Sequence, residues 1–266
     1  MVYETVKAGP CPIGVMAKVE IIPITNITII DKGSDIGEEI AKAVKAMGVD
    51  LLEGDIIVIA HSIVSRAEGS FVRLSEVTPS PFAVKIAEVT GKDPRHVEVI
   101  LQNSRKIVRM EGGLLICETH HGFVCANAGV DASNSGGIDV VLTLPKDPDR
   151  SAENIRRRLR EIAGVDVAVI ISDTFGRPFR KGTINVAIGC SGINPLWDRR
   201  GEKDLFGRTL VSKITCIADE LASAAELVMG QADEGIPAAI IRGYRYDRSN
   251  LPAKVVIRER DEDIFR

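Results

Sequence analysis

The spacing of hydrophobic and polar positions changes several times along the chain, and each change predicts a different element. Residues 17–24 are predicted as an opening strand, and apolar runs predict buried strands at residues 55–64, 165–174 and 237–243. Apolar residues at helical spacing predict helices at residues 34–48, 81–91, 93–104 and 147–164. Ser151 is expected to cap the last of these helices. Residues 203–230 are expected to begin as a strand and to continue as a long helix that ends at Gly230.

Shorter apolar segments complete the pattern. Two strands are expected at residues 112–119 and 122–130, around the turn His120-His121-Gly122, and another at residues 138–145. The glycines of "GCSGIN" (189–194) are typical of close backbone packing. Strands and helices mix without a regular β-α-β alternation, so the predicted fold class is α/β or mixed α+β, and a doubly wound sheet is not favoured.

Composition narrows the class of protein. The chain has 266 residues, of which 45% are hydrophobic, which predicts a globular protein of one large or two small domains. No apolar run reaches the ~18–20 residues that a bilayer span needs, and the first residues do not resemble a signal peptide. Five cysteines without a C-x-x-C pair favour a reducing compartment. We therefore expect a cytoplasmic protein without a membrane partner.

The charge pattern argues against a nucleic-acid partner. The formal net charge is −3, and no Lys/Arg block is interleaved with aromatic residues. The densest basic run, Arg156 to Arg158 with Arg160, lies in a helical pattern and is typical of a solvated helix face.

Polar residues follow three of the apolar runs. Functional residues of sheet proteins often lie at strand ends, because the strands form a rigid scaffold and the loops can carry varied side chains. These groups are Ser62, Arg66 and Glu68; Asn127, Asp131, Ser133 and Asn134; and Asp173, Thr174, Arg177, Arg180 and Lys181. A fourth group, Gln231, Asp233 and Glu234, follows the long helix, although a helix end before Gly and Pro needs no function.

Asp131 and Asp173 are the strongest candidates for chemistry. Two carboxylates beside a hydroxyl and amides form an all-oxygen set, which suits Mg²⁺ or Mn²⁺. The neighbouring Arg177, Arg180 and Lys181 would suit phosphate. The alternative is that Asp131 starts a turn and Asp173 caps a helix, each binding backbone amides.

The stretch "ICETHHGFVCANAGVDASN" (116–134) also raises the possibility of zinc. Cys117, His120, His121 and Cys125 give C-x2-H-H-x3-C, but structural zinc usually takes ligands from two separated pairs. Buried thiols beside a polar hairpin turn are the favoured interpretation. The phosphate-loop motif G-x-x-x-x-G-K-[ST] and the dinucleotide motif G-x-G-x-x-G after a strand are both missing, so any nucleotide is bound without a standard phosphate loop.

Five motifs in one order carry a resemblance to a known family. They are "VCANAGVDASN" (124–134), "VIISDTFGRPFRKG" (169–182), "VAIGCSGINPLWDRRGEKDLFGR" (186–208), "ADELASAAELVMG" (218–230) and "GIPAAIIRG" (235–243). Together they resemble the coenzyme F420-0:L-glutamate ligase family, the γ-glutamyl ligases of coenzyme F420 biosynthesis. The likeness runs from about Glu20 to the closing "RDEDIFR". Residues 1–18 are then an N-terminal extension, and residues 19–266 are a single catalytic region, expected as two intertwined lobes.

The resemblance implies a GTP-dependent amide ligase that needs Mg²⁺ or Mn²⁺, expected as two ions, is aided by K⁺ and acts as a homodimer. The implied fold is two-lobed and is neither an ATP-grasp nor a P-loop fold. In the family's pattern, Asp131 and Asp173 are catalytic and bind one metal, and Thr174 and Gln231 go with a second. The implied nucleotide site comprises Asn26, Ile27, Thr28, Ile29, His61, Ser62, Arg66, Asn134, Met229, Gly230, Gln231, Ala232, Asp233, Glu234, Gly235 and Ile236.

Two positions depart from the family's pattern. Arg66 stands where a lysine is common, and its guanidinium would bind phosphate with a different geometry. Gln231 stands where some members carry Glu, which removes one negative charge from the second metal position. The Gln231 departure bears on metal affinity and number, and leaves the reaction class unchanged.

The implied reaction joins L-glutamate to the lactyl carboxylate of F420-0 through an acyl phosphate, with addition of further γ-linked glutamates as an extension. A glutamate ligase acting on another cofactor, such as a pterin, is one alternative. The same carboxylates would also suit a metal-dependent phosphohydrolase, and a domain that only binds the coenzyme or a nucleotide is a third alternative. The roles of His120 and His121 stay open.

Overall fold

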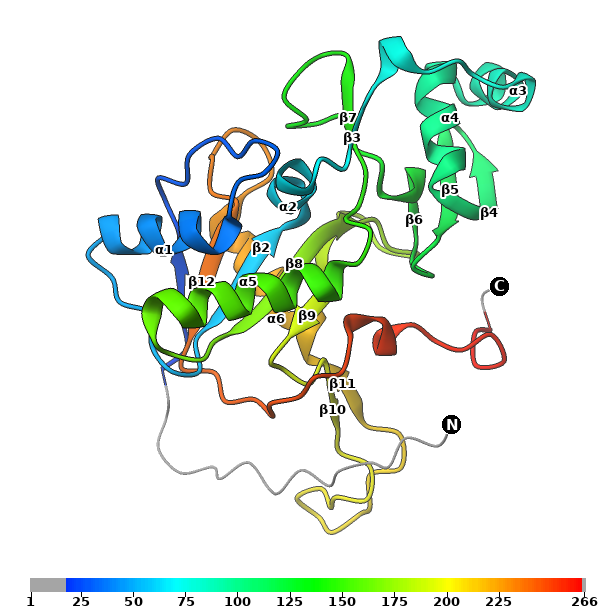
Figure 1. Cartoon of the computed structure of the whole chain (residues 1–266). Helices are drawn as coiled ribbons and strands as arrows, with labels where there is room; N and C mark the ends of the chain where they lie inside the picture. Colours follow the sequence, from blue (N-terminus) through cyan, green and yellow to red (C-terminus); the bar gives the residue numbers. More distant parts are fainter. Residues whose placement is uncertain (1–17, 265–266) are drawn as a thin grey trace.

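The computed structural model describes residues 18–264, so the predicted extension falls outside the described residues except for Lys18. At its centre is a five-stranded sheet with the order β1-β12-β2-β8-β9. The strands are β1 (Glu20–Pro23), β12 (Ala238–Arg242), β2 (Ile56–Ala60), β8 (Ala168–Phe175) and β9 (Ile184–Ser191). Strands β2 and β8 are parallel, and the other neighbours are antiparallel. Figure 1 shows the sheet with helices on both sides.

Side chains of the central strands point alternately to the two faces of the sheet, and both faces are covered by helices. Ile57 and Ile59 of β2 face one core, together with α1 (Ile36–Ala46) and α5 (Pro148–Ala163). Ile56 and Val58 face the other core, which contains α6 (Ile217–Met229). Successive strand residues point to opposite faces, so a continuous apolar run is what two buried faces require. Burying each aliphatic side chain stabilises the fold by about 1.5–3 kcal/mol.

Residues 71–142 form a smaller part with its own core, which we call the small lobe. It contains β3 (Phe71–Arg73), η1 (Leu74–Glu76), α3 (Pro81–Thr90), α4 (Pro94–Gln102), β4 (Ser104–Glu111), β5 (Leu114–Thr119), β6 (Val124–Ala126), η2 (Asn127–Gly129) and β7 (Val140–Leu142). Strands β4, β5 and β6 form an antiparallel sheet against which α3 and α4 pack through Ile86, Ile100 and Leu115. The predicted class of mixed α/β protein is confirmed.

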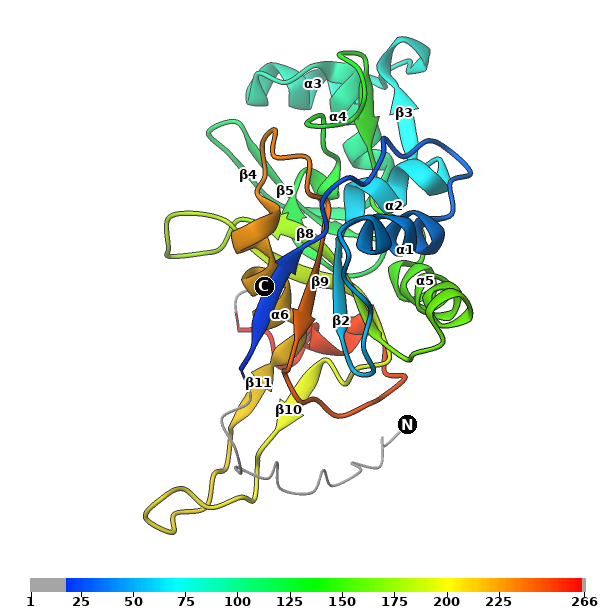
Figure 2. The same cartoon turned by 90° about the vertical axis from the view of Figure 1, so that its left-hand side faces the viewer.

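A hairpin arm extends away from the central sheet (Figures 1 and 2). Its base is the antiparallel pair β10 (Leu196–Asp198) and β11 (Ile214–Cys216), which leads directly into α6. The tip exposes Leu205 and Phe206 almost completely, at 99% and 95%. A short 3₁₀ turn, η3 (Ala253–Val256), lies near the end of the chain.

Most predicted elements are present, but their boundaries differ in places. The apolar run 55–64 is not one strand: β2 ends at Ala60 and α2 (His61–Glu68) begins at once, closing on the left-handed Gly69 (φ 73°). The helix starting at Pro148 is capped by Asp147, which accepts the N–H of Arg150, so the predicted cap at Ser151 is wrong. Of the strand expected from residue 203, only β11 forms.

Strand β9 was not predicted as a strand, but its glycine does mark close backbone packing. A Cβ atom at Gly189 would lie 2.4 Å from the carbonyl carbon of Pro148, the first residue of α5. The prediction of close packing at "GCSGIN" is therefore confirmed at Gly189. Between residues 18 and 264, no helix has the length and apolar character needed to cross a membrane.

Candidate active site

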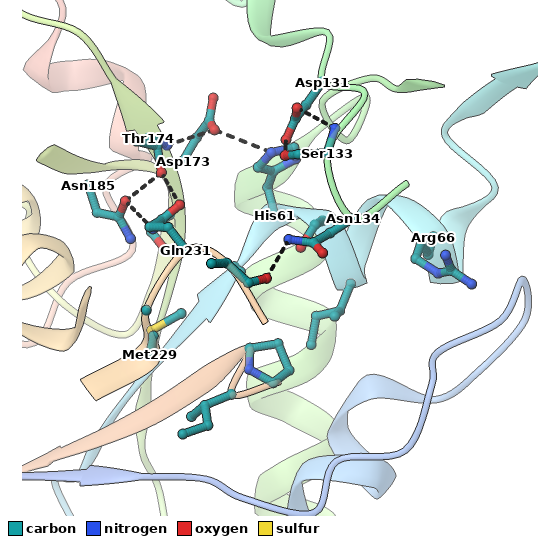
Figure 3. Close-up of a pocket in the computed structure, with 18 of the residues that line it drawn as sticks. His61, Arg66, Asp131, Ser133, Asn134, Asp173, Thr174, Asn185, Met229 and Gln231 are labelled. Atoms are coloured by element: carbon teal, nitrogen blue, oxygen red, sulfur yellow. Dashed lines mark hydrogen bonds and ion pairs between the residues drawn. The ribbon is translucent and has the colours of Figure 1, made fainter. Parts of the chain in front are cut away.

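The main cavity lies at the end of β2, beside residues 172–174 of its parallel neighbour β8. Ala60 of β2 pairs with Ser172 of β8, so the residues that follow, His61 and Asp173, meet at the same edge of the sheet. The cavity measures about 940 Å³, within the range of small-molecule sites. Its walls also include the segment before Asp131 and the turn after α6, which come from distant parts of the chain (Figure 3).

Asp173 forms a buried ion pair with His61. Its Oδ1 atom lies 3.2 Å from Nε2 of His61 and accepts the N–H of Thr174 at 2.7 Å. Burial lowers the pKa of His61, but the negative charges of Asp173 and then Asp131 outweigh burial, so the pKa is raised overall. Both carboxylates therefore lie close enough to act on one imidazole, as the sequence hypothesis of a shared site requires.

Asp131 reaches the cavity from the small lobe. Its backbone forms a bridge with Leu142, and its carboxylate accepts the N–H of Ser133 at 2.8 Å and the Ser133 hydroxyl at 2.6 Å. Asp131 thus does start a turn, and it also lines the cavity. The corresponding alternative for Asp173, a helix cap, is wrong, because Asp173 lies within β8.

Thr174 and Gln231 meet although they are 57 residues apart. The Thr174 hydroxyl lies 2.8 Å from Oε1 of Gln231. The same hydroxyl lies 2.8 Å from Oδ1 of Asn185, a residue of β9. This Oδ1 atom also accepts a hydrogen bond from Nε2 of Gln231 at 3.1 Å. Figure 3 shows these three side chains grouped beside Asp173. The second pair implied by the resemblance is therefore assembled in space.

The turn after α6 forms the wall opposite Asp131. It begins at Gly230, whose backbone (φ 67°, ψ −177°) is one that glycine alone adopts readily, and a Cβ there would meet the Glu234 carboxyl at 2.2 Å. Glu234 accepts the N–H of Ala232 at 2.8 Å, and backbone amides of the turn lower its pKa. Nδ2 of Asn134 donates to the carbonyl of Ala232 at 3.3 Å. The turn is thus held by its own carboxylate and tied to the small lobe.

Arg66 joins two loops at the rim of the cavity. Its Nε donates to the carbonyl of Ile30 at 2.7 Å, and its Nη1 donates to the carbonyl of Ser135 at 3.1 Å. Asp31 lies 3.5 Å from Nη2. The guanidinium fork makes both carbonyl bonds at once, which a lysine ammonium at the same place would not do with the same geometry. The side chain predicted to bind phosphate therefore also fastens the loops around the site.

Most residues of the implied nucleotide site line the cavity. They are Ile27, Thr28, Ile29, His61, Ser62, Arg66, Asn134 and the whole turn from Met229 to Ile236. Asn26 is not among the lining residues; it adopts a left-handed backbone (φ 64°), and its side chain donates to Thr25. Arg177, Arg180 and Lys181 also lie outside the lining, on the exposed connection between β8 and β9.

The Cys117, His120, His121 and Cys125 group does not form a metal site. Cys117 and Cys125 are direct cross-strand partners, while Nε2 of His120 lies 3.0 Å from the carbonyl of Gln102. Nε2 of His121 lies 3.0 Å from the carbonyl of Pro145. Within residues 18–264, no group of three or more His, Cys, Asp and Glu side chains could hold a metal. Both histidines line a second cavity of about 670 Å³.

The residues that sequence reasoning missed are polar groups inside apolar strands. Asn185 interrupts the alternation of β9, and Ser172 precedes Asp173 in β8; both are buried and both line the cavity. An amide within a buried strand needs a hydrogen-bond partner, and this was the available signal for Asn185.

The side chains fit divalent cations only together with a ligand. Asp131 and Asp173 supply carboxylate oxygens, and Thr174 and Gln231 supply neutral oxygens, which are the donor types that Mg²⁺ and Mn²⁺ take. With no third carboxylate in the group, phosphate oxygens and water would complete the coordination, as is usual for Mg²⁺.

Comparisons with known proteins assign the chain to a family. The family described as F420-0:Gamma-glutamyl ligase matches residues 25–243. Relatives named Coenzyme F420:L-glutamate ligase occur in Methanothermobacter thermautotrophicus, 52% identical over 93% of this chain and 99% of the relative, and in Methanopyrus kandleri, 52% identical over 95% and 100%. A relative of the same name from Archaeoglobus fulgidus is 39% identical over 94% and 97%.

The chain has a mixed α/β fold, and both the matching family and these relatives are ligases. The protein is therefore a ligase. The chain belongs to the F420-0:Gamma-glutamyl ligase family.

Proposed function

We propose that the protein joins the amine of L-glutamate to the lactyl carboxylate of coenzyme F420-0, with GTP as the phosphoryl donor. The observation that carries the proposal is that Asp131 and Asp173, from separate lobes, line one cavity with the hydroxyl–amide pair Thr174 and Gln231. The relatives' printed name, Coenzyme F420:L-glutamate ligase, supports the choice of substrates.

The chemistry needs an activated carboxylate, because carboxylate oxygen is a poor leaving group. An oxygen of the lactyl carboxylate attacks the γ-phosphorus of GTP, the bond from that phosphorus to the β–γ bridging oxygen breaks, and GDP leaves. The glutamate nitrogen then attacks the acyl carbon, the bond to the phosphate oxygen breaks, and inorganic phosphate leaves as the nitrogen loses its proton. The products are the amide, GDP and phosphate.

The chain's own residues bind and orient the reactants. Asp131 and Asp173 would hold one divalent ion, and Thr174 and Gln231 would hold a second. When bound, Mg²⁺ or Mn²⁺ neutralises the charge on the transferring phosphoryl group. His61 keeps the Asp173 carboxylate fixed through its 3.2 Å contact. Positioning of this kind supplies much of the rate in phosphoryl transfer.

The nucleotide is proposed to lie between two walls of the cavity. Residues 27–29 and Arg66 form one wall, and the turn 229–236 forms the other, tied to Asn134. Backbone amides of the turn hold the Glu234 carboxylate, which fixes the shape of this wall. We assign GTP to this cavity because the residues of the implied nucleotide site line it, with K⁺ as an accessory ion.

The hairpin arm supports a homodimer as part of the proposal. Its tip exposes Leu205 and Phe206, and fully exposed neighbouring apolar residues are typical of association surfaces. Light scattering of the purified protein would report a mass of two chains. A monomeric mass at micromolar concentration would remove this part of the proposal.

The deciding experiment incubates the protein with F420-0, GTP, Mn²⁺ and L-glutamate and follows products by mass spectrometry. Glutamylated coenzyme should appear in step with GDP and phosphate, and a ladder of masses would report further γ-linked glutamates. Phosphate release without glutamate would instead indicate a phosphohydrolase. AMP with pyrophosphate would exclude the acyl-phosphate route, and reaction of a pterin carboxylate alone would change the acceptor.

A further inference from the structure

Asn185 occupies the point where β8, β9 and α6 meet beside the cavity. Its side chain is buried, and it lies opposite Thr174 in the register of the antiparallel pair β8 and β9. Its backbone carbonyl accepts the hydroxyl of Ser223 on α6 at 2.7 Å. Contacts with β8 and α6 therefore hold Asn185 in place within β9, and the residue lines the cavity.

The short contacts among Asn185, Thr174 and Gln231 outnumber the hydrogen atoms that are directed into them. Thr174 carries a single hydroxyl hydrogen, but its oxygen lies 2.8 Å from both Oδ1 of Asn185 and Oε1 of Gln231. The only other hydrogen directed at these oxygens comes from Nε2 of Gln231, which donates to Oδ1 of Asn185. One oxygen–oxygen contact of 2.8 Å is thus left without a proton, which is repulsive unless something positive lies nearby.

Two arrangements relieve this shortage. In the first, the oxygens of Thr174, Asn185 and Gln231 face one another and a cation balances them. In the second, both amides are reversed, so that Asn185 and Gln231 donate to Thr174, whose lone pairs are then used and unable to bind a cation. The first arrangement agrees with the placement of Asp173, a carboxylate one residue from Thr174, beside the group.

We infer that Asn185 is a positioning residue: its oxygen accepts from the Thr174 hydroxyl and the Gln231 amide, and this turns the oxygens of Thr174 and Gln231 toward the cation proposed for that place. The inference rests on the proposed function for the identity of the two cation-holding side chains. Asn185 acts through them: it accepts from both, fixes the orientation of the Gln231 amide and directs the Thr174 hydroxyl. Polar partners that orient metal-holding side chains typically change metal affinity or activity by about 10–100-fold when removed.

Two substitutions distinguish the arrangements. Asn185→Asp keeps an oxygen acceptor facing Thr174 and Gln231, whereas Asn185→Leu removes all polar atoms at similar volume. The measurement is Mn²⁺ binding in the presence of GTP, followed by electron paramagnetic resonance, together with thermal unfolding without metal. We expect Asn185→Leu to weaken Mn²⁺ binding by about 10–100-fold and Asn185→Asp to restore binding toward the wild-type value.

Ser223→Ala is the matched control, because the Ser223 hydroxyl donates to the backbone carbonyl of Asn185 and Ser223 lies outside the cavity lining. It should leave Mn²⁺ binding within about two-fold, which separates loss of the amide from loosening of β9 against α6. A double variant, Asn185→Leu with Gln231→Leu, should bind Mn²⁺ no more weakly than Gln231→Leu alone, because both changes disable the same cation position.

The inference is overturned if Asn185→Leu binds Mn²⁺ like the wild type, or if Asn185→Asp fails as completely as Asn185→Leu, since that would require a donor at this place. Failure of the proposed function looks different. In that case the wild type would form no glutamylated coenzyme in the full reaction mixture, while Mn²⁺ binding would still depend on Asn185.

Discussion

His61 and Asp173 form a buried pair at the edge of the central sheet, with Nε2 and Oδ1 3.2 Å apart and side chains only 7% and 12% exposed. The pair exists because β2 and β8 are parallel neighbours in register. β2 ends at Ala60 and leads into α2, whereas β8 continues past Ser172 and places Asp173 beside His61. Asp131, in contrast, makes its carboxylate hydrogen bonds with Ser133, two residues away. The two carboxylates of the site are thus held by different means.

The first prediction concerns activity. Asp131→Asn should lower ligation by about 10²–10⁴-fold, because an uncharged amide holds a divalent cation and its phosphates poorly. The fold should persist, since Asn retains an oxygen that accepts the N–H of Ser133. Asp139→Asn is the control: it is also a turn aspartate of the small lobe, bonded to the N–H of Ser75, but it does not line the cavity. Wild-type ligation by Asp131→Asn would remove this residue from the site.

The second prediction separates the two carboxylates by stability. Asp173→Asn should destabilise the protein by about 3 kcal/mol, because it removes one partner of a buried ion pair. Asp131→Asn should cost less than about 1 kcal/mol, because its bonds are local and partly retained. Chemical denaturation of both variants measures the difference. Equal stability losses would contradict the different anchoring of the two residues.

The third prediction tests the fastening of the loops by Arg66. Gly136 has φ +92°, and a Cβ there would lie 2.2 Å from Nη1 of Arg66, so Gly136→Ala must both strain the backbone and displace the guanidinium. We expect a loss of about 1–2 kcal/mol and a raised KM for GTP. Gly137→Ala is the matched control, because its Cβ would meet only Val140, at 3.6 Å. Similar effects of the two substitutions in thermal unfolding and kinetics would refute this role of Arg66.

The fourth prediction concerns Gly189. A Cβ atom would lie 2.4 Å from the Pro148 carbonyl carbon and 2.5 Å from its oxygen, and these backbone atoms cannot move without shifting the start of α5. Gly189→Ala should therefore cost about 3 kcal/mol through overpacking. Gly176→Ala, which meets nothing within 4 Å, should stay within about 0.5 kcal/mol. Denaturant midpoints of the two variants provide the comparison, and a stable Gly189→Ala would exclude close packing here.

The fifth prediction is a pH dependence in the small lobe. Asp93 caps α4, and its hydrogen bonds with Arg95 lower its pKa from 3.8 to about 2. A lowered carboxyl pKa stabilises the fold above the ordinary value and loses its effect as the pH falls through about 2. Asp93→Asn keeps the cap without the charge, so it should cost about 0.5 kcal/mol at pH 6 and nothing near pH 2. A constant difference in Tm across this range would contradict the assignment.

Much of the fold follows from periodicity because most elements are amphipathic or fully buried. Residues 168–171 of β8 and 238–241 of β12 are apolar at every position, since both faces of the sheet are covered, and α5 carries a clear apolar face. The boundary at His61 was missed because the apolar pattern continues from β2 into α2 without a turn residue. Strand β9 was missed because its glycine and its buried Asn185 weaken the strand pattern, and both are explained only by tertiary contacts.

The sequence predicted which residues belong to the candidate site better than it predicted how they are arranged. Asp131, Asp173, Thr174 and Gln231 stand out by type and by the family's pattern, and they line one cavity. Arg177, Arg180 and Lys181 lie outside the cavity lining, on the connection between β8 and β9, and the sequence alone gave no reason to expect this. The partnership of Asn185 with Thr174 depends on strand register, which is a long-range property.

The small lobe has a core of its own, yet it delivers Asp131 to a cavity whose other carboxylate stands on the central sheet. Activity consequently demands that both cores be intact and seated against each other at the same moment. Heating or mild denaturant should abolish activity when the less stable core unfolds. The more stable core should still give the spectroscopic signal of a folded protein under those conditions. We therefore expect inactivation and global unfolding to be two separate events.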